Sequence, residues 1–359
     1  MLQQSDKTIR ASLLLLYLSQ YHWYSSFPAV ESRPRQPSGN EARMNASQLT
    51  ISSSLVIAIA MPGAAVADSS VYASLRQSLV YTESGATTGD SDDTSLVDQG
   101  SRVGLQGSQE FDGYRGFGRV EFGFDGNEQN SSPVVRLGYV GISGDFGTIS
   151  VGSQWSAWDT YVGDEDTNFV TEGDWQNGTG RNGDTLKYAG RLGDLSIEAD
   201  VVFAGRDGTA NRGLLDEMQL ALGYSVGSVT LQGALIERDG GIDGYLGGGS
   251  LMGARLSYEA GPLGLSLAVA QDDANFGGSE ETLGVKVKAS YTTGPNTMLA
   301  VVSSSDNQIA ANAPIAVALG YQHDLSNRSR VSLELSSVDP DIAGLDSSIE
   351  GGVMYRHDW

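Results

Sequence analysis

The sequence predicts an all-β protein, a 16-stranded antiparallel transmembrane β-barrel. Three observations predict this fold. Apolar and polar residues alternate with a period of two over sixteen short segments, short and long connections alternate between them, and Gly accounts for 47 of the 359 residues. A period of two places successive side chains on opposite faces of a strand. Frequent glycine suits many tight turns and closely spaced strands.

The alternation is clearest between Ser101 and Gly152. One parity there is apolar: Val103, Leu105, Val120, Phe122, Phe124, Val135, Leu137, Tyr139, Ile149 and Val151. The other parity is polar: Arg102, Gln106, Arg119, Glu121, Arg136 and Gln154. A soluble β-sandwich would bury the apolar parity. A membrane barrel instead turns the apolar parity outward to lipid and the polar parity inward to a lumen.

The length and number of the segments favour the barrel. A tilted strand needs about 9–11 residues to cross a bilayer. The predicted strands are residues 71–83, 100–110, 115–124, 134–143, 147–154, 184–191, 195–204, 214–225, 228–238, 249–259, 263–272, 281–292, 296–305, 314–324, 329–338 and 347–359. An even strand count with short periplasmic turns and long extracellular loops is typical of outer-membrane barrels. Closure of the last strand on the first removes exposed sheet edges.

Tyrosines recur toward the ends of the predicted strands. They are Tyr81, Tyr139, Tyr188, Tyr224, Tyr258, Tyr291 and Tyr321. Aromatic residues form girdles at both membrane interfaces of such barrels. We therefore expect these side chains to lie on the outer surface.

The N-terminal part predicts export. Leu55–Ala60 is a short apolar run, Met61-Pro62-Gly63 interrupts it, and Ala65-Val66-Ala67 forms an A-x-A cleavage site. We expect a signal peptide over residues 44–67, cleavage between Ala67 and Asp68, and a barrel over residues 68–359. Residues 1–43 are expected to be either an extension from a start codon assigned too early or a disordered segment.

Composition excludes several classes of function. The chain has no Cys, so it has neither disulfides nor thiolate metal sites, and three His disfavour a His-based catalytic or zinc centre. We expect no metal, no cofactor and no enzyme activity. The formal net charge is −22, with 22 Lys and Arg against 44 Asp and Glu. Such acidity disfavours nucleic acid as a partner, because phosphate binding needs a basic face.

Several stretches carry a family resemblance. SRVGLQGSQEF (101–111), GFGRVEFGF (116–124) and VRLGYVGISGDFGTISVG (135–152) resemble the second to fifth strands of Gram-negative general porins, and RNGDTLKY (181–188) resembles the start of their sixth. The chain ends YRHDW. This ending is similar to the aromatic-terminated last strand that the outer-membrane assembly machinery reads, with Trp in place of the usual Phe. The assembly residues implied are Tyr355, His357 and Trp359.

The resemblance implies a homotrimer whose third long loop folds into each barrel and faces arginines on the wall. That loop is Trp155–Gly183, the longest connection, and it lacks the Pro-Glu-Phe-Gly tip of the best-known porins. The wall candidates are Arg76, Arg102, Arg119, Glu121, Arg136 and Arg181. The loop candidates are Asp159, Asp164, Glu165, Asp166 and Glu172. The acids of residues 164–166 are alternatively a solvated loop tip or a Ca²⁺ site, although their spacing matches no EF-hand.

These observations lead us to expect an outer-membrane porin for passive diffusion of ions and small hydrophilic solutes. From Asp68 onward the chain carries 17 Lys and Arg against 41 Asp and Glu, which predicts mild cation selectivity. Expected partners are outer-membrane lipid and lipopolysaccharide, the assembly machinery, and two further copies of the chain. Alternatives are a substrate-specific nutrient channel on the same fold, an outer-membrane enzyme, and a secreted β-sandwich binding module.

Overall fold

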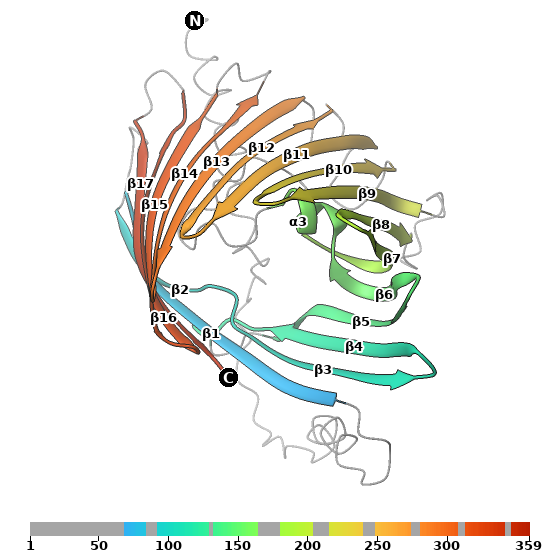
Figure 1. Cartoon of the computed structure of the whole chain (residues 1–359). Coiled ribbons are helices and arrows are strands. Elements are labelled where there is room, and N and C mark those ends of the chain that lie inside the picture. Colours follow the sequence, from blue (N-terminus) through green and yellow to red (C-terminus); the bar gives the residue numbers. More distant parts are fainter. Residues whose placement is uncertain are drawn as a thin grey trace, which may run out of the picture. The chain divides into compact units, whose positions relative to one another are not determined.

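The structure is a computed structural model that describes residues 68–83, 92–128, 132–163, 180–203, 215–239, 248–273, 281–307, 313–341 and 346–359. In these ranges seventeen strands form one antiparallel sheet. The sheet closes because β1 (Asp68–Glu83) pairs with β17 (Ser348–Asp358), so the result is a barrel (Figure 1). No helix in the described ranges is long and apolar enough to cross a membrane.

The other strands follow one another around the sheet in sequence order, with β2 and β3 both paired to β1. They are β2 (Asp93–Asp98), β3 (Arg102–Phe111), β4 (Tyr114–Gly123), β5 (Val134–Gly144), β6 (Gly147–Trp155), β7 (Arg181–Leu192), β8 (Leu195–Phe203), β9 (Leu215–Val226), β10 (Val229–Arg238), β11 (Gly249–Ala260), β12 (Leu263–Asp272), β13 (Thr282–Thr293), β14 (Asn296–Asn307), β15 (Ile315–Ser326) and β16 (Ser329–Asp339).

Strands β2 and β3 together fill one place in the barrel. β1 pairs with β3 through its first half and with β2 through its second half. The interruption follows from Asp98, whose carboxylate accepts hydrogen bonds from the backbone N–H groups of Gly100 and Ser101 at 2.9 and 2.7 Å. Such local bonds compete with the strand ladder. The barrel therefore has the sixteen strands predicted, although residues 93–98 were expected to be loop.

The outer surface is apolar, as the alternation predicts. Leu, Val and Ile side chains that are 37–66% exposed recur on every other residue of the strands, including Leu79, Leu96, Val151, Leu222 and Leu335. Six of the seven tyrosines expected on this surface are also exposed: Tyr81, Tyr188, Tyr224, Tyr258, Tyr291 and Tyr321. An apolar exterior of this kind is suited to lipid contact.

Strand β5 departs from the predicted parity. Glu121 pairs with Leu137 and Phe122 pairs with Val135, so Arg136 is an extra residue that forms a β-bulge. A bulge moves the following side chains to the other face. Leu137 is therefore buried, and Tyr139 pairs with the inward residue Arg119. The prediction that Leu137 and Tyr139 face outward was wrong.

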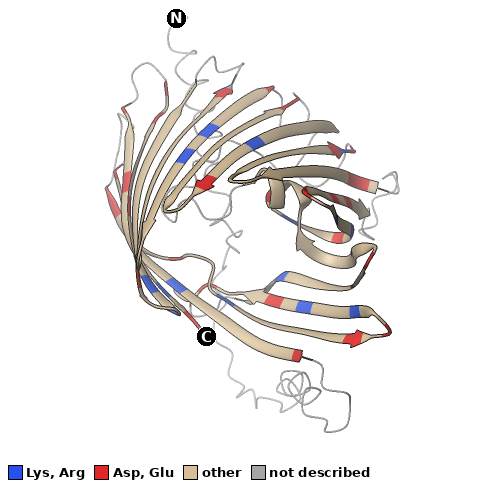
Figure 2. Cartoon of the chain, viewed as in Figure 1, with Lys and Arg blue, Asp and Glu red and all other residues tan. Residues whose placement is uncertain are grey.

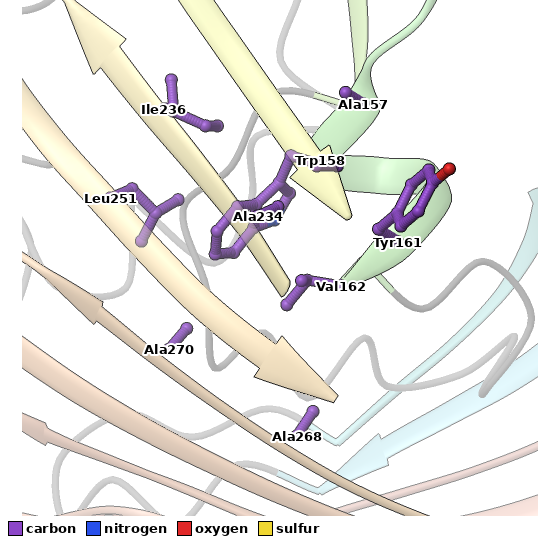
Figure 3. Packing of buried hydrophobic residues seen from close by; sticks show 10 residues of the cluster. Ala157, Trp158, Tyr161, Val162, Ala234, Ile236, Leu251, Ala268 and Ala270 are labelled. Carbon is purple, nitrogen blue, oxygen red and sulfur yellow. The ribbon is translucent and has the colours of Figure 1, made fainter. Parts of the chain in front are cut away.

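The apolar core lies inside the barrel, where the third long connection enters it. Helix α3 (Ala157–Tyr161) follows β6 and contacts β8, β9 and β10. Figure 3 shows Trp158 and Val162 facing small and branched side chains of the wall. This buried cluster comprises Ala157, Trp158, Tyr161, Val162, Ala221, Ala234, Ile236, Leu251, Ala268 and Ala270. The expected inward folding of the third loop is confirmed for its described part.

Candidate functional site

A network of charged side chains lies on the inner face of β1, β3, β4 and β5. We call Tyr72, Arg102, Arg119, Glu121 and Arg136 the wall cluster. Arg119 Nη2 donates to Glu121 Oε2 at 2.8 Å, and Arg136 Nε donates to Glu121 Oε1 at 2.9 Å. Arg102 Nε lies 3.9 Å from Glu121 Oε2. Figure 2 shows Lys and Arg on β1, β4 and β5, with acidic residues on β4.

Strand register brings these side chains together. Residues directly opposite in an antiparallel pair project to the same face. Glu121 is opposite Gly104, which in turn is opposite Tyr72. Two glycines in this area leave room for larger neighbours, because a Cβ on Gly123 would lie 2.7 Å from Arg136 Cδ and one on Gly104 would lie 2.3 Å from the Tyr72 ring. The β5 bulge turns Arg136 toward the same carboxylate.

Tyr72 connects β1 to β4 across Gly104. Its hydroxyl donates to Glu121 Oε2 at 2.7 Å and accepts from Arg119 Nε at 2.6 Å. The Arg119 guanidinium also lies 4.9 Å from the centre of the Tyr72 ring, within the range of a cation–π interaction. Tyr72 therefore fixes both the acid and one base of the wall cluster.

The charges of the wall cluster are unevenly exposed. The Glu121 side chain is 2% exposed, whereas those of Arg102, Arg119 and Arg136 are 22%, 29% and 15% exposed. A buried carboxylate is costly unless it is paired and hydrogen-bonded. Here three guanidinium groups and one hydroxyl surround it. The surface offered to the barrel interior is consequently basic.

The inserted loop is held by its backbone on other strands of the wall, namely β8, β9 and β11. The N–H groups of Ala157 and Trp158 donate to Asp200 Oδ2 at 2.6 Å and to Gln219 Oε1 at 2.8 Å. These are N–H groups that the first turn of a helix leaves without an intrahelical partner. After α3, Arg255 Nη1 on β11 donates to the carbonyl of Gly163 at 2.7 Å. Both ends of the described insertion are thus fixed to strands.

Further buried ion pairs support this attachment. Lys187 on β7 contacts Glu198 and lies 3.7 Å from Asp200, and its Nζ donates to the carbonyl of Trp155. On the neighbouring strands, Arg238 pairs with Glu217 at 2.8 Å. In the described ranges no group of three or more His, Asp or Glu side chains is arranged to hold a metal ion.

The structure brings together only part of the predicted site. Arg102, Arg119, Glu121 and Arg136 form the wall cluster. Arg76 lies nearby on β1, where its backbone N–H donates to Ser101 Oγ at 3.0 Å. Arg181 begins β7 and lies 5.0 Å from the Trp155 ring, two strands away from β5. Asp159 lies on α3, and the predicted residues Asp164, Glu165, Asp166 and Glu172 lie outside the described residues.

Two of the predicted assembly residues, Tyr355 and His357, share one face of β17, and Trp359 directly follows the strand. Tyr355 and Trp359 are 48% and 53% exposed. The His357 and Trp359 rings meet edge to face with centroids 4.4 Å apart, and Trp359 N donates to the carbonyl of Ala73 on β1 at 3.0 Å. The C-terminus therefore takes part in closing the barrel. At the predicted cleavage site, Asp68 begins β1 and Ala67 lies outside the described residues.

Several site residues were missed at the sequence level. Tyr72 has the same parity as Arg76 on β1, and this parity could have predicted that Tyr72 faces inward. Its contact with Glu121 depends on the pairing of β1 with β3. The attachment residues of α3, namely Lys187, Glu198, Asp200, Gln219 and Arg255, also occupy the inward parity of their strands, but no motif marks them.

We predict that Gly104→Ala disrupts the wall cluster, because its Cβ would lie 2.3 Å from the Tyr72 ring. Overpacking of this kind costs about 1–3 kcal/mol. Urea unfolding of the refolded barrel, followed by Trp fluorescence, measures this loss. Gly107→Ala on the same strand is the control, since its Cβ would meet nothing closer than 3.6 Å. Equal stability of the two variants would contradict the conclusion that Gly104 leaves the space in which the Tyr72 ring lies.

Residues 53–342 match the sequence profile of the family described as Gram-negative porin. No curated protein matches the chain.

Similar solved structures include an anion-selective porin from Comamonas acidovorans, with 17% identity, a TM-score of 0.70, and coverage of 82% of this chain and 100% of that one. The outer membrane channel DcaP of Acinetobacter baumannii has 14% identity and a TM-score of 0.65, covering 83% and 99%. OmpF of Salmonella typhi has 16% identity and a TM-score of 0.62, covering 80% and 97%. At such identities these likenesses establish the fold, and the family follows from the profile match. The chain belongs to the Gram-negative porin family and is an outer-membrane β-barrel protein.

Proposed function

We propose that the chain forms a water-filled channel for passive diffusion of ions and small hydrophilic solutes. The observation that carries this proposal is the wall cluster, a group of partly exposed guanidiniums on the inside of a barrel whose outside is apolar. Charges are costly to remove from water, so a lumen lined by them stays hydrated. Porins are channels rather than enzymes, and we propose the same of this chain.

We further propose that the wall cluster and the inserted loop form the constriction. Support comes from α3, which is packed inside the barrel, and from the basic wall at β3 to β5. Arg76 and Arg181 on the wall, and Asp159, Asp164, Glu165, Asp166 and Glu172 of the loop, are proposed to complete the constriction. Their opposed charges would create a transverse field that orients polar solutes.

The ion preference follows from two opposing charge distributions. The barrel portion from Asp68 onward has 41 acidic against 17 basic residues, which favours cations at the channel mouths. The wall cluster, with three Arg and one Glu, favours anions inside. The Debye length is about 10 Å at 0.1 M and about 3 Å at 1 M salt, so salt screens the more distant charges first. We propose mild cation selectivity at low salt that shifts toward anions as salt rises.

We also propose the assembly state and the export route. A homotrimer is supported by the fold likeness to the trimer form of OmpT from Vibrio cholerae, at 16% identity and a TM-score of 0.62. The proposed route comprises cleavage between Ala67 and Asp68 and recognition of Tyr355, His357 and Trp359 by the assembly machinery. Outer-membrane lipid and lipopolysaccharide are the proposed surroundings.

A substrate-specific channel on the same fold is the second candidate, because Arg119 and Tyr72 form a preorganised polar surface on the wall. A saturable block of the ion current by one solute would distinguish it from a general diffusion channel. A secreted binding module is disfavoured by the apolar outer surface, which would need detergent in solution.

Single-channel recording of refolded residues 68–359 in a planar bilayer tests the proposal. We expect stepwise ohmic conductance in groups of three. Reversal potentials under KCl gradients should indicate cation preference at low salt and a smaller or reversed preference at high salt. A detergent-soluble barrel without conductance would contradict the channel. A preference for anions at low salt would contradict the proposed selectivity.

Replacement of Glu121 tests the role of the wall cluster. Glu121→Gln removes the carboxylate shared by three guanidiniums, so we expect the chloride-to-potassium permeability ratio to rise about two- to fivefold. Arg136→Gln should lower this ratio. Glu110→Gln is the matched control, because Glu110 is 76% exposed beside Arg115. An equal shift in the two Glu variants would contradict a special role for Glu121.

A further inference from the structure

Among the described residues, Trp158 has the bulkiest side chain that is completely buried, with 1% exposure. It extends from α3 toward the inner face of β10 and β11 (Figure 3). The residues of these strands that lie around its ring form two directly opposite pairs, Ala234 with Gly253 and Ile236 with Leu251. We call these four residues the Trp158 socket. Since directly opposite residues share a face, all four positions face the barrel interior.

Gly253 is the position that makes room for the ring. A Cβ on Gly253 would lie 2.6 Å from Trp158 Cη2, 3.2 Å from Trp158 Cζ3 and 2.8 Å from Val162 Cγ1. Carbon atoms in optimal contact lie about 3.5–4.0 Å apart. The six-membered ring of the indole therefore rests directly on the backbone of β11, and the socket has no space for one more methyl group. Glycine within a strand often marks such a close approach.

Helix α3 presents one side to the socket and another to the barrel interior. Trp158 and Val162 are four residues apart, so they lie on the same side, and both are buried. Between them, Asp159 is half-buried and Thr160 is exposed. The helix has only five residues, too few to be stable by itself. Its distance from the wall consequently depends on its contacts with the wall.

The contact between the ring and β11 is more rigid than the polar contacts of the insertion. The carboxylate of Asp200 and the amide of Gln219 accept from the backbone of α3, and the Arg255 guanidinium donates to the carbonyl of Gly163. These wall groups are ends of side chains, which can move by changing rotamer. The backbone under the indole belongs to a closed sheet and cannot yield in this way. The ring therefore determines how closely α3 approaches the wall.

We propose that Trp158 is a positioning residue of the channel: its ring is a spacer between α3 and the wall, and the spacing sets the width of the channel at the inserted loop. The inference deepens the proposed constriction and rests on the proposed channel function. A methyl group added at Gly253 would displace α3 by about 1 Å toward the lumen, the difference between the clash and an ordinary carbon contact. Because no charge changes, the size limit should respond.

The test is the single-channel conductance of Gly253→Ala, together with the largest neutral poly(ethylene glycol) that enters the channel and lowers its current. We expect lower conductance and a smaller size limit than in the wild type. Trp158→Phe removes the ring atoms that would meet the new methyl group, so the double variant should regain the lost conductance. Trp158→Phe alone should not narrow the channel. Gly233→Ala on β10 is the matched control, since its Cβ would meet nothing closer than 3.5 Å.

The outcomes separate the inference from the proposed function. Absence of conductance in the wild-type protein would overturn the channel itself. A conducting wild type with equal conductance and size limit in the Gly253 and Gly233 variants would overturn only the role of Trp158, as would a double variant that regains nothing.

Trp158→Ala keeps the inference testable if Gly253→Ala fails to fold, because it adds no atoms to the barrel. Without the ring, α3 loses its spacer and much of its apolar attachment. We expect the open-channel current to fluctuate between levels and larger poly(ethylene glycol) molecules to enter. A steady current with the wild-type size limit would contradict the inference.

Discussion

The carboxylate of Glu121 is the contact on which the inner wall depends. It is almost completely buried, and a lone charge in that position would be strongly unfavourable. Three guanidiniums and the Tyr72 hydroxyl approach it from four strands, so the acid holds together bases that would otherwise repel one another. The small residues Gly104 and Gly123 and the bulge at Arg136 are the backbone features that make this convergence possible. The basic surface of the lumen is therefore built around a buried acid.

The inserted loop is attached in a different manner. Its helix α3 is anchored by backbone N–H groups that donate to Asp200 and Gln219, and by apolar packing of Trp158. Gly253 leaves the necessary space, since a Cβ there would lie 2.6 Å from the Trp158 ring. The wall cluster and this attachment lie on different strands of one closed sheet. A charged wall and a fixed insertion can thus coexist without competing for the same side chains.

Period-two alternation was sufficient to predict the barrel, its sixteen strands and the inward side of Arg102, Arg119 and Glu121. It failed where a local feature changes parity, because the bulge at Arg136 is set by the pairing with β4 and has no signature in the β5 sequence alone. The alternation also could not predict that Arg330 and Arg356 lie beside Arg76. These residues are distant in the sequence, and their proximity depends on the register in which the barrel closes. Tyr72 was missed for the same reason, since its partner belongs to a strand that is not adjacent in the sheet.

The most direct test of this account is a double-mutant cycle on the free energy of unfolding, with Glu121→Gln and Arg136→Gln. Residues in one ion-pair network show coupling of about 0.5–3 kcal/mol, whereas distant residues are additive within about 0.5 kcal/mol. We predict clear coupling for Glu121 with Arg136. We predict additivity for Glu121 with Arg115, which lies on the same strand and pairs instead with Glu110. Additivity in both cycles would contradict the central role of the Glu121 carboxylate.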